Sequence, residues 1–206
     1  MGVCAFVLGD SGSGKSYSLR NFESDEVGIL NVMSKPLPFR KKMQVLNKAS
    51  YNQVMNALQK NIRRCYVVDD AGYLMQMENF RRIKEPGYAK YAEMALHFEQ
   101  LIEAATSTNE DTIVYVMMHY DVEANGRMKP RTIGKMLDEK FCIEGASPIV
   151  LQAAVQDGRH VFVTTNDGFN AVKCPPEMLP DVMDNDLAAV DDAIREYWHM
   201  APRKGE

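Results

Sequence analysis

The feature that most constrains this chain is a glycine-rich stretch close to its N-terminus, Gly9-Asp-Ser-Gly-Ser-Gly14-Lys15-Ser16. It matches the pattern G-x-x-x-x-G-K-[ST] and directly follows an apolar run typical of a buried strand. Glycines allow backbone conformations that aim successive N–H groups at phosphate oxygens. Lys15 is then placed to reach the β- and γ-phosphates of a nucleotide, and the Ser16 hydroxyl to bind Mg²⁺. The motif predicts an α/β fold built around a nucleotide-phosphate site.

The residues expected to hold the nucleotide form one continuous segment. They are Gly9, Asp10, Ser11, Gly12, Ser13, Gly14, Lys15, Ser16 and Tyr17. ATP and Mg²⁺ are the cofactors that this segment predicts, because the guanine-reading pattern N-K-x-D does not occur in the chain. A helix starting at the end of the segment and reaching about Phe22 would add its positive pole to the phosphate site.

A pair of aspartates follows the apolar run Tyr66-Val-Val, about fifty residues beyond Lys15. A carboxylate at the tip of a neighbouring strand is needed to hold the magnesium shell. We assign Asp69 to the metal, together with Ser16. For Asp70 two roles remain open, which are polarising the attacking water and capping the helix that follows.

His119 follows the most apolar run of the chain, residues 112–118. A polar side chain at this strand end can contact the γ-phosphate and report hydrolysis to the next loop. The alternative is a purely structural histidine. With Lys15 and Asp70, His119 completes the predicted catalytic set.

Charge is distributed unevenly along the chain. The 24 Lys and Arg residues against 28 Asp and Glu give a formal net charge of −4, which excludes a general basic field for nucleic acid. One basic group stands out, consisting of Arg127, Lys129, Arg131 and Lys135. It is interpreted as a finger that enters a neighbouring subunit's phosphate site, as a contact to single-stranded DNA, or as a solvated loop.

The remaining pattern predicts a single domain over residues 1–206, with a mostly parallel sheet flanked by helices. Strands are expected at 3–8, 27–32, 65–68 and 112–118, and Asp157-Gly158 predicts a C-terminal β-hairpin. A long helical region should break near Pro86-Gly87, and Asn185 should cap the last helix. No run approaches the roughly 20 apolar residues needed to cross a bilayer, so we expect no membrane partner.

The features resemble small phage-encoded P-loop ATPases with a RecA-like core, which are grouped with AAA-type domains and linked to single-strand annealing and recombination. The residues that carry the resemblance are Gly9 to Arg20, Asn31-Val-Met-Ser-Lys-Pro-Leu-Pro38, Tyr66 to Asp70, His119 and Thr132-Ile-Gly-Lys-Met136. The resemblance implies ATP hydrolysis coupled to self-assembly on single-stranded DNA. It also implies a location in the host cell cytoplasm, and a sheet in which the strand before His119 lies between the other two site strands.

The chain departs from this pattern at one place. RecA-like relatives carry a water-activating Glu after the second strand, whereas residues 31–40 contain no acidic residue. The base role then passes to Asp70, or to Glu23, Asp25 or Glu26, and we expect slow turnover without a partner. Two other functions remain open, which are a small-molecule or nucleotide kinase and a nucleotide-binding assembly switch with little turnover.

Overall fold

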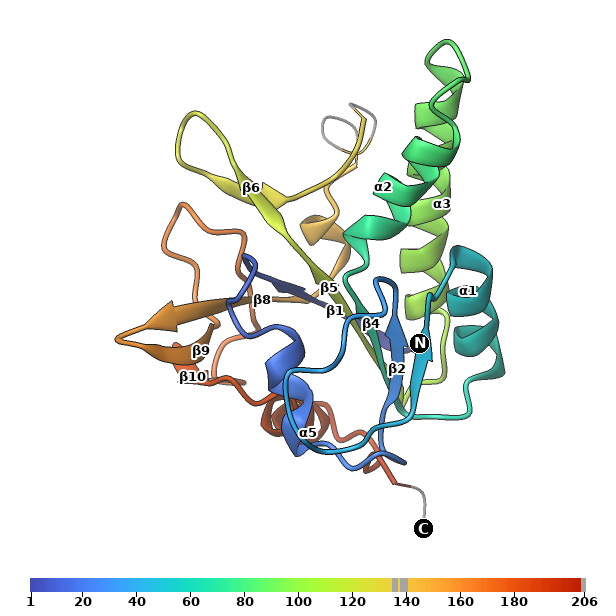
Figure 1. Cartoon of the computed structure of the whole chain (residues 1–206). Coiled ribbons are helices and arrows are strands. Elements are labelled where there is room, and N and C mark those ends of the chain that lie inside the picture. Colours follow the sequence, from blue (N-terminus) through green and yellow to red (C-terminus); the bar gives the residue numbers. More distant parts are fainter. Residues whose placement is uncertain (135–136, 138–140, 205–206) are drawn as a thin grey trace.

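The computed structural model describes residues 1–134, 137 and 141–204. In these residues the central element is an eight-stranded sheet with the order β10-β9-β8-β1-β5-β4-β2-β3 (Figure 1). The six strands from β8 to β3 are parallel, and β9 and β10 add antiparallel pairs at one end. The strands are β1 (Val3–Leu8), β2 (Gly28–Asn31), β3 (Val45–Asn47), β4 (Cys65–Asp69), β5 (Ile113–Met118), β8 (Ile149–Gln156), β9 (Arg159–Val163) and β10 (Val182–Asp184).

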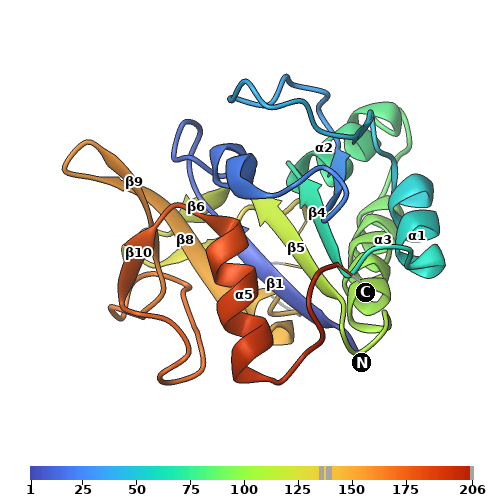
Figure 2. The same cartoon turned by 90° about the horizontal axis from the view of Figure 1, so that it is seen from below.

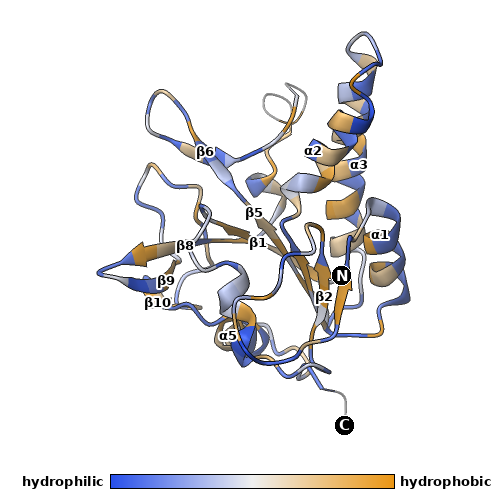
Figure 3. Ribbon diagram, in the orientation of Figure 1, coloured by the Kyte–Doolittle hydropathy of each residue, from blue (hydrophilic) through white to orange (hydrophobic). Residues whose placement is uncertain are grey.

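Helices cover both faces of the sheet (Figure 2), which confirms the predicted α/β class. One face is covered by α1 (Tyr51–Lys60), α2 (Gly72–Arg81) and α3 (Ala89–Thr106), and the other by η1 (Ser16–Asn21) and α5 (Leu187–Tyr197). Side chains of a strand alternate between faces, so Phe6 packs under the first group and Val7 under the second. Burial on both sides explains why the central strands are continuously apolar (Figure 3).

The strand order brings the predicted site residues to one edge. β5 lies between β1 and β4, as the resemblance implied. Because the strands are parallel, their carboxyl ends meet at the same side, with Leu8 opposite Met118 and Asn31 opposite Asp69. The glycine-rich loop (residues 9–16), the Asp69-Asp70 pair and His119 follow directly from these ends.

Several local predictions are confirmed. The long helical region breaks at residues 82–88, which lie between α2 and α3 and include Pro86-Gly87. The C-terminal hairpin joins β8 to β9 around Asp157-Gly158. Cys4 and Cys65 are buried in the core, and Ser50 caps α1 in a capping box with Gln53.

Two helix predictions are wrong. The helix expected up to about Phe22 is instead η1, a six-residue 3₁₀ helix, and the chain is extended at Phe22, whose ring is fully buried. The helix pole predicted for the phosphate site is therefore reduced to this short segment. Asp186, not Asn185, caps α5, because its carboxylate accepts hydrogen bonds from the amides of residues 188 and 189.

A second hairpin follows His119. It consists of β6 (Tyr120–Val122) and β7 (Met128–Pro130), and it extends beyond the end of β5 (Figure 1). The turn at Asn125-Gly126 closes it, with Gly126 at φ +85°. We refer to residues 120–130 as the β6–β7 hairpin.

A buried ion pair fixes α5 to the rest of the chain. Arg195 Nε lies 2.6 Å from Asp191 Oδ1, and both side chains are almost fully buried. The remaining guanidinium nitrogens donate to the carbonyl oxygens of Arg64, Asp111 and Ala201. Every charge is thus compensated, as burial of an ion pair requires.

Candidate functional site

The glycine-rich loop is built so that two positions accept no side chain. The loop leaves β1 with the Gly9 amide donating to the carbonyl of Met118 at 3.1 Å. A Cβ on Gly9 would lie 2.3 Å from Ser13 Oγ and 2.9 Å from the Ala153 carbonyl oxygen. Gly14 has φ +101°, and a Cβ there would lie 2.9 Å from His160 Nδ1. Both motif glycines are therefore required by the backbone and its neighbours.

The Lys15 side chain folds back across the loop that precedes it. Its ammonium donates to the carbonyl oxygens of Gly9 at 2.7 Å and Asp10 at 2.9 Å. The residue is only 7% exposed, and burial lowers the pKa of the ammonium. The nearby charges of Asp70 and Asp69 oppose this shift. The Lys15 ammonium is thus held inside the loop by two carbonyl groups, and a bound phosphate would compete with them for it.

Ser16 and Asp69 form the direct link between the loop and β4. The Ser16 hydroxyl donates to the Asp69 carboxylate, with distances of 3.0 and 2.9 Å to its two oxygens. Asp69 is buried, and burial together with the charge of Asp70 raises the pKa of its carboxyl group to about 6. A cation bound beside the Asp69 carboxylate would stabilise its charged form and lower this pKa.

This pair fits the needs of Mg²⁺. The ion prefers oxygen ligands, keeps several waters, and is usually held by one or two carboxylates plus substrate phosphates. Within the described residues no group of three or more His, Cys, Asp or Glu side chains is placed to bind a metal ion. Asp69 and Ser16 supply two oxygen ligands of this kind, and substrate phosphate oxygens and waters would supply the others. Ser13 Oγ, buried and without a hydrogen-bond partner among the described residues, is a further oxygen inside the loop.

Asp70 turns away from Asp69 and does not cap α2. Its backbone has φ +61°, a left-handed conformation that Asp tolerates better than most residues, and no side chain caps the helix. Asp70 Oδ2 accepts a hydrogen bond from Lys35 Nζ at 2.7 Å, and Oδ1 lies 3.8 Å from His119 Nε2. The capping alternative for Asp70 is therefore wrong.

Lys35 is a site residue that sequence reasoning missed. It follows β2, whose last residue, Asn31, is buried and organises the next turn. Asn31 accepts from the Ser34 amide at 2.7 Å and donates to the Lys35 carbonyl at 2.8 Å. The available signal was the parallel strand itself, since a lysine just beyond its carboxyl end must lie near the same edge as Asp70.

His119 lies where the sequence predicted, at the end of β5. Burial lowers the pKa of its imidazole, and the positive charge of Lys15 adds to the effect. The ring packs edge-on against Tyr73 with centroids 6.0 Å apart. A neutral imidazole beside Asp70 is suited to hydrogen bonding with a phosphate or a water molecule.

Tyr120 connects the β6–β7 hairpin to the loop. Its hydroxyl donates to Asp10 Oδ2 at 2.8 Å. Burial, followed by this hydrogen bond, raises the pKa of the phenol to about 12, so it stays protonated. A shift of the loop at Asp10 therefore acts directly on the first residue of the hairpin.

His160, for which the sequence predicted no role, contacts the far side of the loop. Its Nδ1 lies 3.1 Å from the Ser13 carbonyl oxygen, and its ring lies 5.7 Å from that of Tyr17. The Arg20 guanidinium covers Tyr17 at 4.4 Å from the ring centroid. Asn185, predicted as a helix cap, has its buried amide next to Gly14 instead. The β9 strand and the segment before α5 thus pack against the glycine-rich loop.

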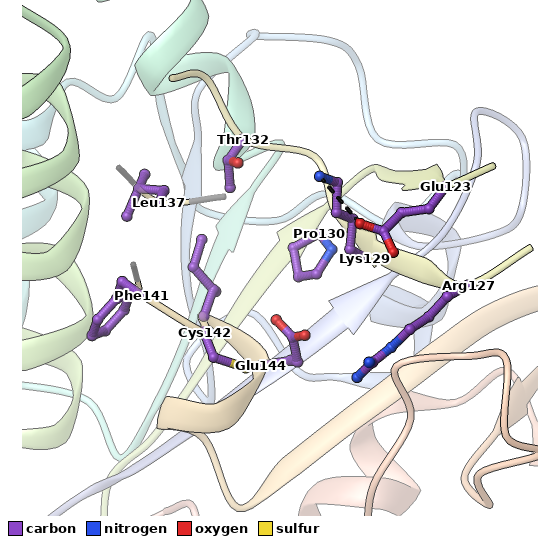
Figure 4. Close-up of a pocket in the computed structure, with 10 residues that line it drawn as sticks. Glu123, Arg127, Lys129, Pro130, Thr132, Leu137, Phe141, Cys142 and Glu144 are labelled. Atoms are coloured by element: carbon purple, nitrogen blue, oxygen red, sulfur yellow. Dashed lines mark ion pairs between the residues drawn. The ribbon is translucent and has the colours of Figure 1, made fainter. Parts of the chain in front are cut away.

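The basic group is largely balanced by acids of the same hairpin. Arg131 Nε lies 2.7 Å from Asp121. Lys129 Nζ lies 3.7 Å from Glu123 (Figure 4). Arg127 is exposed. Lys135 lies outside the described residues. A pocket of about 370 Å³ lies beside the hairpin, lined in part by Arg127, Lys129, Phe141, Cys142 and Glu144 (Figure 4). This pocket does not include any residue of the glycine-rich loop.

The alternative bases are not brought to the site. Glu23, Asp25 and Glu26 precede β2 and therefore lie at the opposite edge of the sheet. Glu23 is paired with Lys41 at 2.7 Å, and Asp25 with Lys204 at 3.4 Å. Among these candidates, Asp70 alone lies with Lys15, Asp69 and His119.

Comparisons with known proteins do not assign a function to this chain. Neither a scan against protein-family models nor a search of curated proteins found a match to this chain. No helix in residues 1–134, 137 and 141–204 has the length and apolar character needed to cross a bilayer.

Proposed function

We propose that this chain is a P-loop ATPase that binds ATP with Mg²⁺ at residues 9–17 and hydrolyses the γ-phosphate. The observation that carries the proposal is the contact between Ser16 and the buried Asp69, formed beside a loop whose Gly9 and Gly14 leave no room for side chains. The position of Lys15 within that loop adds the expected phosphate-binding cation. The strand order supports a RecA-like arrangement for the core.

Each site residue has a task in this reaction. Bound Mg²⁺ would neutralise charge on the phosphate oxygens. Lys15 leaves its carbonyl partners to contact the β- and γ-phosphates, and His119 orients near the terminal phosphate. The Asp70 carboxylate takes a proton from water as the water oxygen attacks the γ-phosphorus. The bond from that phosphorus to the β–γ bridging oxygen breaks, its electron pair leaves on ADP, and Asp70 later returns the proton to solvent.

A nucleotide switch with little turnover is a second candidate, and one observation favours it. Lys35 Nζ lies 2.7 Å from Asp70 Oδ2, so one of the two carboxylate oxygens is already paired with a lysine in this state. A chain held in this state would bind nucleotide and hydrolyse it slowly. The two candidates differ in whether the Asp70 contact opens when nucleotide binds.

Action on single-stranded DNA and self-assembly are the remaining parts of the proposal. They are supported by the resemblance described above and by Arg127 at the exposed hairpin. Because Glu123 and Asp121 balance Lys129 and Arg131, this hairpin should contribute only weakly to the electrostatic binding of DNA. The affinity of this group for DNA should fall only modestly as salt rises, because few phosphates would be contacted.

The test measures ATP binding, phosphate release and particle mass together, with and without single-stranded DNA. Lys15→Ala should abolish nucleotide binding, whereas Lys60→Ala, at the exposed end of α1, serves as the matched control. Asp70→Asn should retain nucleotide and lose turnover. Phosphate release without an acceptor supports the ATPase, strict dependence on an acceptor supports a kinase, and unchanged binding by Lys15→Ala would refute the site.

A further inference from the structure

Lys35 has a fixed backbone at the edge of the site. Its carbonyl accepts from the buried Asn31 amide, and Ser34 before it has φ +56°. The Ser34 hydroxyl also accepts a hydrogen bond from the Lys48 amide at 2.7 Å. These contacts anchor the turn to two neighbouring strands, β2 and β3, so the point from which the lysine side chain starts is well defined.

The Lys35 side chain itself is much less constrained. It is 58% exposed, while the side chain of its partner Asp70 is 8% exposed. The ammonium lies 2.7 Å from Asp70 Oδ2 and 5.2 Å from the centre of the Tyr73 ring. A lysine carries its charge on a flexible four-carbon stem, so the ammonium can change partners while the backbone stays in place.

The charges around Lys35 show what a second partner would be. Its positive charge acts on both Lys15 and His119, the two groups assigned to the terminal phosphate. Lys15 is occupied by two loop carbonyls, and Asp70 is the group that would face the attacking water. A phosphate bound between these residues would bring negative charge next to the Lys35 ammonium, and under the proposed function that phosphate is the γ-phosphate.

We propose that Lys35 is a second phosphate-binding lysine, whose ammonium exchanges Asp70 for the γ-phosphate when a nucleoside triphosphate binds. This inference rests on the proposed function. The exchange leaves the Asp70 carboxylate unpaired toward the attacking water only when a triphosphate is present. It also places a second positive charge on the phosphate that is transferred. The site would thus distinguish ATP from ADP through one side chain on the loop after β2.

The test is a binding cycle on the full chain with Mg²⁺, using ADP and a non-hydrolysable ATP analogue. The variants are Lys35→Gln, Asp70→Asn and the double variant, with Lys35→Arg as the conservative replacement. Lys42→Gln, an exposed lysine on the same connection, is the matched control. Thermal unfolding of each variant checks that the fold is retained.

The exchange predicts different effects for the two nucleotides. Lys35→Gln should weaken the ATP analogue about fivefold or more, because a charge-assisted hydrogen bond is lost, and leave ADP nearly unchanged. Asp70→Asn should increase the affinity for the ATP analogue, because Lys35 no longer has to give up its ion pair with Asp70 to reach the phosphate. That gain should disappear in the double variant, and Lys35→Arg should restore part of the preference for the analogue.

Three results would overturn the exchange. If Lys35→Gln reduced the affinity for ADP and for the ATP analogue equally, the role of Lys35 would be to hold the structure of the turn. An Asp70→Asn gain that persists in the double variant would show that Lys35 does not carry it. An increase in phosphate release by Lys35→Gln, with no change in affinity, would make Lys35 only an inhibitor. Failure of the proposed function is distinguishable, because the wild-type chain would then bind neither nucleotide in a Lys15-dependent way.

Discussion

Replacing Asp69 by asparagine should make the chain more stable and, at the same time, unable to hold Mg²⁺. The carboxylate is buried next to a second aspartate, and its pKa is raised from 3.8 to about 6. Asparagine has nearly the same shape and can still accept the hydrogen bond from Ser16. The variant therefore removes the cost of a buried charge without leaving a cavity.

The size of the gain follows from the pKa difference. At neutral pH the raised pKa corresponds to about 3 kcal/mol of lost stability, and because the buried amide has its own desolvation cost we expect a gain of roughly 2–3 kcal/mol. For a chain of this length the gain should raise Tm by roughly 4–12 °C. The folded chain keeps the Asp69 proton at pH values where the unfolded chain has lost it, so wild-type stability falls as pH rises from about 4 to about 6.

The assay is thermal unfolding in metal-free buffer between about pH 4.5 and 7.5, followed by nucleotide binding with Mg²⁺. The difference in stability between Asp69→Asn and wild type should grow from about pH 4.5 to about pH 6 and level off above that. Asp157→Asn, which removes an exposed carboxylate in the β8–β9 turn, should show no such trend. A destabilised Asp69→Asn variant, or a gain independent of pH, would refute the reasoning.

Three further outcomes are expected. Gly14→Ala should lower Tm and abolish nucleotide binding, because its Cβ would lie 2.9 Å from a histidine nitrogen. Gly12→Ala carries a similar backbone strain at φ +80° but meets no atom within 4 Å, so it should retain more binding. Arg195→Met should cost about 3–5 kcal/mol in chemical denaturation, because the buried Asp191 loses its 2.6 Å partner and keeps only the longer 3.3 Å contact with Arg203 and the hydrogen bond from Tyr115. Tyr120→Phe loses the hydrogen bond to Asp10 and should increase amide exchange in the β6–β7 hairpin without a large change in Tm.

The core of the fold was predictable because burial on both faces gives continuous apolar strands. The strands before Gly9, Asp69 and His119 were found for this reason, and their order followed from the resemblance. The short η1 was not predictable from local sequence. Its length is set by Phe22, which turns into the core and ends the helix, and this is a tertiary effect.

The site was predictable where a residue belongs to a contiguous motif and less so elsewhere. Ser16 and Asp69 were paired in advance because loop and strand end have known chemistry. Lys35 and His160 were missed because each reaches the loop region from a different element, and nothing in their immediate neighbours marks them. Only the three-dimensional arrangement of β2, β9 and β1 brings them to the same place.

The two ends of the sheet have a consequence for how copies of this chain can associate. The terminal strands of the described sheet, β3 and β10, are each only three residues long. Such short edges offer few free backbone groups, a feature that protects proteins from edge-to-edge aggregation. A ring or filament of this chain would therefore be joined through side-chain surfaces, and solvent exposure of its strand edges should not change on assembly.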